Sequence, residues 1–170
     1  MKKTVFIFLC IICILIPIGA YSGGIVRSIK MNVNCLDYLS MAADANSVEL
    51  ADKYLSIGID YIEKNNLTQG STEIFIYSPK KDLKLWYENL KSAQSQLREL
   101  NLKEDLTDLE ESNTLMKLRE SLLDEAGYLI YPTNISTYPN HVGWFWYLST
   151  VWLLWAGAVF FGIFAYEEDY

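Results

Sequence analysis

Two strongly apolar segments enclose a longer stretch in which apolar and polar residues alternate with helical spacing. The C-terminal apolar segment, residues 144–166, contains no charged residue and is followed by a short acidic tail over residues 167–170. As an α-helix this segment would measure about 34 Å, which exceeds the roughly 30 Å thickness of a bilayer's hydrocarbon core. We therefore predict a transmembrane helix over residues 144–166.

The N-terminal segment, residues 1–22, has the features of two kinds of membrane-targeting element. Lysines precede its apolar run, and the small residues Ala20 and Ser22 occupy the −3 and −1 positions of a cleavage site before Gly23, as in a signal peptide. The apolar run is also long enough for an uncleaved anchor. Residues 1–22 are therefore predicted to be either a signal peptide or a signal-anchor helix.

Both interpretations predict the same membrane topology. With the N-terminal lysines retained in the cytoplasm, the middle of the chain is exported, and the C-terminal helix returns the tail to the cytoplasm. Arg27 and Lys30 leave the opposite orientation open, because positive residues beside a membrane helix favour the cytoplasmic side. The predicted localisation is the membrane, with an extracytoplasmic soluble domain.

The middle of the chain has the apolar periodicity of four amphipathic helices, within residues 34–45, 46–66, 78–100 and 105–127. Short connections between such helices favour antiparallel packing. The predicted fold class is therefore all-α, with a small antiparallel bundle of about four helices over residues 23–127.

The third of these segments has the most regular apolar spacing. Its apolar residues follow one another at intervals of three and four, which is the heptad pattern of a seam that packs against another helix. This helix seam consists of Leu83, Trp86, Leu90, Ala93, Leu97 and Leu100.

Capping signals predict where the helices begin and end. Asn46 and Glu49 have the spacing of a capping box at the start of the second helix. Ser78 followed by Pro79 predicts the start of the third helix, and Gly127 the end of the fourth. The residues expected to face inward are Cys35, Leu36, Leu39 and Ala43 in the first segment, and Leu106, Leu109, Met116 and Leu123 in the fourth, with Leu115, Leu118 and Leu122 beside them.

Two further segments are predicted to be non-helical. Residues 72–78, TEIFIYS, are rich in β-branched and aromatic side chains but have no second strand to pair with, so they form an extended connector or an edge for a partner. Residues 128–143 contain two prolines and no helical period. They are predicted to be an extended linker that packs over the bundle or tethers it to the membrane.

The charge distribution narrows the classes of partner. The net charge is −7, and residues 31–143 contain 10 Lys or Arg against 18 Asp or Glu. The domain therefore lacks the basic face that would neutralise phosphates, and we expect no nucleic-acid partner. For the same reason the domain is not expected to lie flat on an anionic lipid surface.

The residues that usually carry chemistry are few and scattered. Cys10 and Cys13 lie in the apolar N-terminal run, where they are expected to be small hydrophobic residues and not a redox pair. Cys35 is the one cysteine of the middle domain, so it is expected to be a buried free thiol or a bridge to another chain. His141 stands alone, without neighbours at ligand spacing, so no metal site is predicted.

The sequence gives little support for an enzyme. It contains neither a phosphate-binding loop nor a dinucleotide fingerprint, and we predict no cofactor. The acidic residues between positions 99 and 111 lack the ligand pattern of a calcium-binding EF-hand loop. An enzyme would depend on carboxylates such as Asp37, Asp44 and Glu49, whose separation in space the sequence does not give. No catalytic residue is predicted.

The C-terminal helix contains a candidate docking strip. Its two inner tryptophans lie deeper than an interfacial aromatic belt requires, and small residues four positions apart allow another helix to approach closely. The docking strip consists of Trp152, Trp155, Ala158, Gly162 and Ala165. The alternative is a lipid-facing single span without a partner.

These features favour a non-catalytic interaction protein anchored in a membrane, a small subunit or assembly factor of a membrane complex. Its expected partners are the lipid bilayer and either other membrane subunits or a second copy of the chain. The alternative is an extracytoplasmic sensor or ligand-binding bundle that relays its signal through a partner. Its pocket would be lined by Tyr38, Tyr54, Tyr61, Trp86 and Tyr87.

Overall fold

The computed structural model describes residues 22–103 and 105–167, with the side chains of the last helix described up to residue 157 and at residue 159. The predictions for residues 1–21, which include the signal peptide or anchor and its cysteines, lie outside the described residues, as does the end of the acidic tail. The chain divides into two compact units. One comprises residues 28–138, and the other comprises residues 1–27 together with 139–170.

The unit of residues 28–138 is helical, as predicted. Residues 28–31 are helical and continue into a π-helical turn, η1, after which four α-helices follow, with two short 3-10 turns in the connections. The described part of the chain contains no β-strand, only two isolated bridges. The elements are η1 (Asn32–Leu36), α2 (Asp37–Ala43), α3 (Val48–Lys64), η2 (Pro79–Lys81), α4 (Leu83–Asn101), α5 (Asp108–Leu122) and η3 (Ile135–Thr137).

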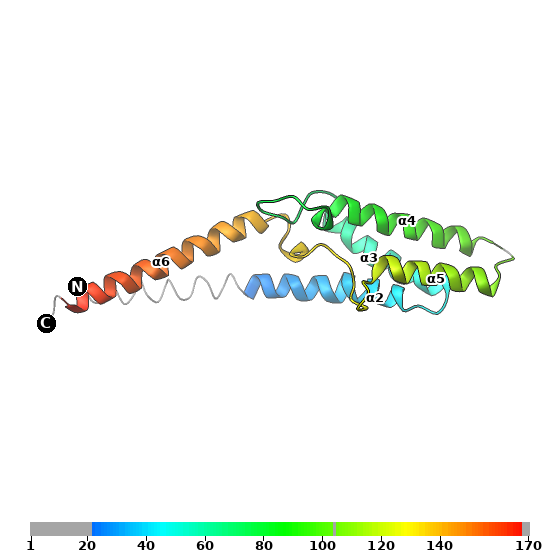
Figure 1. Ribbon diagram of the computed structural model, residues 1–170, viewed down its shortest axis with the longest axis horizontal. Helices are drawn as coiled ribbons and strands as arrows, with labels where there is room; N and C mark the ends of the chain where they lie inside the picture. The colour runs from blue at the N-terminus through cyan, green and yellow to red at the C-terminus, as the bar shows by residue number, and fades with distance from the viewer. Residues whose placement is uncertain (1–21, 104, 168–170) are drawn as a thin grey trace. The chain divides into compact units, whose positions relative to one another are not determined.

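The helices of this unit pack as a bundle around α3 (Figure 1). Pairs between α3 and α4 run in opposite directions along the two helices: Gln94 contacts Ser56, and four residues later Arg98 contacts Asp52. The helix of residues 32–43 also crosses α3 in the antiparallel sense, because Cys35 lies against Gly58 and Tyr38 against Tyr54. These contacts give the bundle its antiparallel order.

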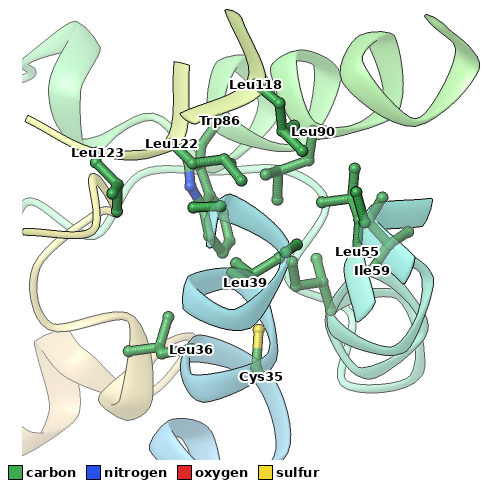
Figure 2. Close-up of a cluster of buried hydrophobic side chains, with 14 of the residues drawn as sticks. Cys35, Leu36, Leu39, Leu55, Ile59, Trp86, Leu90, Leu118, Leu122 and Leu123 are labelled. Carbon is green, nitrogen blue, oxygen red and sulfur yellow. The ribbon is translucent and has the colours of Figure 1, made fainter. Parts of the chain in front are cut away.

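A single apolar core lies between these helices (Figure 2). The residues that were expected to face inward in the first helical segment are buried there. So are α3 residues at helical spacing, whose burial removes apolar surface from water and is the main favourable term in folding. The largest fully buried side chains of this core include Leu39, Leu55, Ile59, Ile62, Leu83, Leu90 and Leu97, and the larger Trp86 is almost fully buried with them.

Two predicted helix starts are wrong. α3 is capped by Ser47, whose extended backbone lets its hydroxyl accept from the Leu50 N–H at 3.3 Å, and not by Asn46. Asp82 caps α4, accepting from the backbone N–H groups of the second and third helical residues at 2.8 and 3.1 Å. Ser78 therefore begins only the short turn η2. In both cases a second capping residue lies within a few positions, and the helix begins directly after that residue.

The inward face of α5 also differs from the prediction. Leu109 and Met116 are exposed, whereas Leu118 and Leu122 are buried against the core. The helix ends at Leu122, earlier than predicted. Of the line predicted to face inward, only Leu123 is buried; it directly follows the end of α5 and lies in the core with Leu118 and Leu122 (Figure 2).

The chain after α5 folds back over the bundle. The backbone pairs in an isolated antiparallel bridge between Leu123 and Leu129. Gly127, with φ of +83°, lies in the turn of this bridge and is not the residue that ends α5. The indole Nε1–H of Trp86 donates to the carbonyl of Ile130 at 3.1 Å, and Ile135 is buried. Residues 123–138 therefore cover the core.

Gly70 and Tyr138 make a close contact. Gly70 has φ of +102°, and a Cβ at this position would collide with the hydroxyl of Tyr138, which donates to the carbonyl of Gln69 at 2.9 Å. We expect Gly70→Ala to lower the free energy of unfolding by about 1–3 kcal/mol, from backbone strain and the collision together. Urea denaturation followed by circular dichroism measures this loss.

Gly127→Ala is the matched control for Gly70→Ala. Gly127 also has a positive φ, but a Cβ there would meet no atom within 4 Å. The control should therefore cost only about 1 kcal/mol of backbone strain. Equal losses for the two variants would contradict the close contact with Tyr138.

In the other unit, residues 22–27 are helical and α6 spans His141–Glu167. α6 begins earlier than the predicted span, with the backbone N–H of Trp144 donating to the carbonyl of Asn140 at 2.9 Å. A search of the described residues finds no helix that is both long enough and apolar enough to cross a membrane. The transmembrane helix over residues 144–166 stays a prediction.

Candidate functional site

The described part of α6 presents an apolar surface. Trp152 of the predicted docking strip is 74% exposed, and Trp155 is 44% exposed. Leu153 and Val159 are exposed as well. The remaining strip residues, Ala158, Gly162 and Ala165, lie within α6, but their side chains are outside the described part of the structure.

The predicted helix seam lies inside the bundle. Leu83, Trp86, Leu90 and Leu97 are buried, and Ala93 and Leu100 are partly buried against the same core. The helices that cover them belong to the same unit of this chain. The seam therefore has an intramolecular partner, and α4 does not present it to another protein.

The five aromatic residues of the predicted ligand pocket are dispersed over the bundle. The ring centroids of Tyr38 and Tyr54 are 6.3 Å apart. The indole of Trp86 donates a hydrogen bond to Ile130 in the segment after α5, and the hydroxyl of Tyr87 donates to Glu63 at 2.6 Å. None of these residues lines the groove of about 390 Å³ that lies between α4 and α5. That groove is lined by Asn89, Ser92, Ala93, Gln96, Leu97, Thr114, Lys117, Leu118 and Ser121.

A polar network joins α3 to α4, and the sequence pattern did not indicate it. Gln94 is buried, and its amide donates to Ser56 at 2.8 Å and accepts from Lys91 at 3.0 Å. Lys91 also forms an ion pair with Glu63 at 3.5 Å. The hydrogen bond from Tyr87 lowers the pKa of the Glu63 carboxyl and raises the pKa of Tyr87 to about 12. Each buried polar atom is paired, so this network fixes the register of two helices.

Two of the acidic residues near α5, Glu110 and Glu111, serve as helix caps. Glu110 forms a capping box with Thr107, which lowers the pKa of the Glu110 carboxyl. Glu111 accepts from the backbone N–H of Val48, the first residue of α3, at 3.0 Å. Within residues 22–103 and 105–167, no group of three or more His, Cys, Asp or Glu side chains is arranged to hold a metal ion.

The carboxylates considered for catalysis are exposed. Asp37, Asp44 and Glu49 lie on the surface of the bundle. Asp44 pairs with Arg119 at 3.5 Å, which links the end of α2 to α5. Asp44 is therefore part of an exposed ion pair between two helices.

Cys35 lies in the apolar core (Figure 2). Its Sγ donates to the carbonyl of Gly58 at 3.6 Å, and burial raises the pKa of the thiol from its ordinary value of 9.0 to about 12. A thiolate is the reactive form of cysteine, so the buried thiol is inert at neutral pH. A bridge to another chain would require this region to open.

We expect the buried thiol to make stability depend on pH above about 9. Its folded pKa is raised, so its contribution is complete below the unfolded pKa and is lost as pH rises toward about 12. The free energy of unfolding should fall by up to about 1.4 kcal/mol per pH unit in this range. Urea denaturation between pH 8 and 11 should show a shallower decline for Cys35→Ala. Labelling of Cys35 by a maleimide at neutral pH without denaturant would contradict the burial.

Residues 74–77 are the most exposed apolar segment of the bundle and were not predicted as such. Phe75 is 73% exposed and Ile76 is 79% exposed, and the neighbouring Tyr77 is exposed as well. The available signal was a run of large apolar residues with no polar residue between them, bounded by Gly70 and Pro79. Such a run is more exposed than a soluble surface normally tolerates.

Comparisons with known proteins give no relative: no family model, curated protein or solved structure matches the chain.

Proposed function

We propose that this chain is a membrane-anchored, non-catalytic interaction protein, a small subunit or assembly factor of a membrane complex. α6 is its anchor, and the helical bundle is its soluble domain on the extracytoplasmic side. The observation that carries the proposal is α6 itself. It is a continuous helix from His141 to Glu167 with no Asp, Glu, Lys or Arg before its last residue.

The side chains of α6 support an anchoring role. Trp152, Leu153 and Leu154 are all more than half exposed, which in water would leave a large unpartnered apolar surface. Lipid or another apolar helix would cover such a surface and remove it from water, which is favourable. Trp144 and Tyr147 lie in the first turns of the helix, where aromatic residues commonly mark the headgroup layer.

The bundle supports a role without catalysis. Its candidate carboxylates are dispersed on the surface, its described thiol is buried, and its polar groups are used as caps and as links between helices. The interaction is therefore assigned to α6, whose small residues at positions 158, 162 and 165 would allow a partner helix to approach closely.

A matched pair of substitutions in α6 tests the interaction. Ala158 belongs to the small-residue part of the docking strip, whereas Ala156 lies about 200° around the helix from it at nearly the same depth, beside Trp152 and away from those small residues. Ala158→Leu and Ala156→Leu add the same side-chain volume on opposite faces. We expect native gel electrophoresis of mild-detergent extracts to show the wild-type chain and Ala156→Leu in an assembly larger than the monomer. Ala158→Leu should run as a smaller species.

Two outcomes would contradict the proposal. If alkaline carbonate washes the full chain from the membrane, the chain is not an integral membrane protein. If the wild-type chain is a monomer in both native membranes and mild detergent, or if the two leucine variants behave alike, the docking strip is not an interface.

The groove between α4 and α5 favours a second candidate, a ligand-binding bundle. Its volume of about 390 Å³ is within the range of small-molecule sites, and polar side chains from both helices, including Gln96, Thr114 and Lys117, line it. A ligand of this groove should raise the melting temperature of the full chain, and Lys117→Ala should reduce the rise while Lys103→Ala leaves it intact. A library of small polar compounds that produces no shift would exclude this candidate.

A further inference from the structure

The loop over residues 72–81 is held firmly at its base. Thr72 is buried, and its backbone N–H donates to the carbonyl of Lys81 at 3.0 Å. Glu73 forms an ion pair with Lys81 at 2.9 Å, and Ser71 and Asp82 form an antiparallel bridge just outside the loop. The loop therefore leaves and returns to the bundle at a fixed point.

The tip of this loop is apolar and exposed. Phe75, Ile76 and Tyr77 project from it. Tyr77 keeps its aromatic ring outward while its hydroxyl donates to Asp82 at 2.6 Å. The backbone at the base of the loop is already hydrogen-bonded to the bundle. The exposed side chains of Phe75 and Ile76 are therefore held in a fixed position at the surface, where they can bind another apolar surface.

The loop lies at the end of the bundle from which the chain leaves for α6. The hydroxyl of Tyr138, the last residue of this unit, donates to the carbonyl of Gln69, close to the base of the loop. α6 begins at His141, three residues after Tyr138. Since each residue spans at most about 3.6 Å, the chain enters α6 within roughly 11 Å of Tyr138.

The charge of the loop also differs from that of the rest of the chain. The loop over residues 72–81 contains Lys80 and Lys81 against one carboxylate, Glu73, which gives a local net charge of +1 in a chain whose net charge is −7. Lys80 is exposed beside the apolar tip. Aromatic and apolar side chains next to an exposed lysine are a composition that favours the interface of an anionic membrane.

We propose that the loop over residues 72–81 inserts Phe75 and Ile76 into the headgroup region of the bilayer in which α6 is anchored, an inference that rests on the anchoring role proposed above. The bundle then contacts the membrane at two points, the connection to α6 and the loop tip. The acidic remainder of the bundle faces water. We choose a lipid surface, and not a protein, as the binding partner of the loop. The helix proposed to be anchored in the bilayer begins three residues after Tyr138, so the bilayer surface is close to the base of the loop.

Depth-dependent fluorescence quenching tests the insertion. A single cysteine is placed at Phe75 in the full chain carrying Cys10→Ser and Cys13→Ser, while Cys35 stays buried and unreactive. The cysteine is labelled with an environment-sensitive dye, and the protein is reconstituted in vesicles of phosphatidylcholine and phosphatidylglycerol. Some of the lipids carry a nitroxide at a shallow or a deep position in the acyl chain. Circular dichroism confirms that each labelled variant keeps the helix content of the parent.

Two further label sites make the result decisive. Leu102→Cys is the matched control, because Leu102 is 84% exposed and follows the C-terminal end of α4, about 28 Å of helix from the loop. Leu153→Cys reports whether α6 itself is in lipid. We expect shallow nitroxides to quench the label at 75 at least about twofold more than the label at 102, and deep nitroxides to quench the label at 153.

Each other outcome overturns the insertion. If the label at 153 is quenched but the labels at 75 and 102 behave alike, the loop is in water and the anchoring role stands. If the label at 153 is not quenched, the anchoring role fails and the insertion fails with it. If the label at 75 is shielded both from lipid nitroxides and from aqueous iodide, protein covers the loop, as a second copy of the chain would.

Discussion

Trp86→Ala is expected to lower the free energy of unfolding of the full chain by about 3–5 kcal/mol. Trp86 is the point where α4, the end of α5 and the chain after α5 meet (Figure 2). Alanine would leave a cavity in this part of the core. It would also remove the indole N–H that donates to Ile130. Urea denaturation in one mild detergent, followed by circular dichroism, measures the loss.

Two controls separate the contributions of Trp86. Trp86→Phe keeps most of the apolar volume but lacks the donor, so it should cost about 1–2 kcal/mol. Leu85→Ala changes the adjacent residue, which is 43% exposed, and should alter stability by only about 0.5 kcal/mol. A loss below about 1 kcal/mol for Trp86→Ala would mean that residues 123–138 do not cover the core as described.

Leu39→Ala is expected to lower the free energy of unfolding by about 2–5 kcal/mol. Leu39 is fully buried on α2, where α2 crosses α3 at Gly58. The absence of a side chain on Gly58 lets the two helices approach at this crossing. A Cβ at position 58 would lie 2.6 Å from Cδ2 of Leu39. The same denaturation measurement applies, with the exposed Leu102→Ala as the neutral reference.

The close approach of α2 to α3 at Gly58 predicts that the effect of Gly58→Ala on stability changes sign when Leu39 is also replaced by alanine. Gly58→Ala alone should cost about 1–3 kcal/mol, because the fully buried Leu39 has little room to move. In the Leu39→Ala background the colliding atoms are gone, so Gly58→Ala should be neutral or should stabilise the chain by up to about 1 kcal/mol through helix propensity. Additive losses in the double variant would show that the two residues do not share this space.

The sequence was sufficient to predict the helices within residues 34–127, because apolar spacing of three and four residues depends on helix geometry alone. It did not predict that residues 22–33 are helical as well. It was insufficient for the helix starts. Asn46 and Ser47 are both good capping residues, and so are Ser78 and Asp82. Ser78 also has an extended backbone but makes no side-chain capping hydrogen bond, whereas the side chains of Ser47 and Asp82 accept from free N–H groups at the starts of α3 and α4. The choice therefore depends on where the helical backbone begins in the fold.

The candidate sites were predictable only where a residue's surroundings follow from its own segment. The buried position of Cys35 follows from the apolar face of its helix. The buried face of α5 does not follow from its own sequence, because the helix has two lines of leucines. In the fold Leu118 is buried and Leu109 is exposed. Gln94 is a polar residue between two buried leucines of the seam, and its partner Ser56 comes from a helix 38 residues away in sequence. A hydrogen bond between residues so far apart in sequence can be identified only from the three-dimensional structure.

Asp82 links the loop over residues 72–81 to the first turn of α4, so we expect these two segments to unfold locally together. Its carboxyl accepts from Tyr77 in the loop and from the first turn of α4, and these bonds lower its pKa. As pH falls through that lowered pKa, the carboxyl is protonated and both sets of bonds weaken together. The amide protons of Thr72, Leu83 and Lys84 should therefore exchange with solvent deuterium at similar rates, whereas those in the middle of α4 exchange far more slowly. The loop and the first turn of α4 would then behave as a single cooperative subunit of the fold, smaller than either the bundle or the helix.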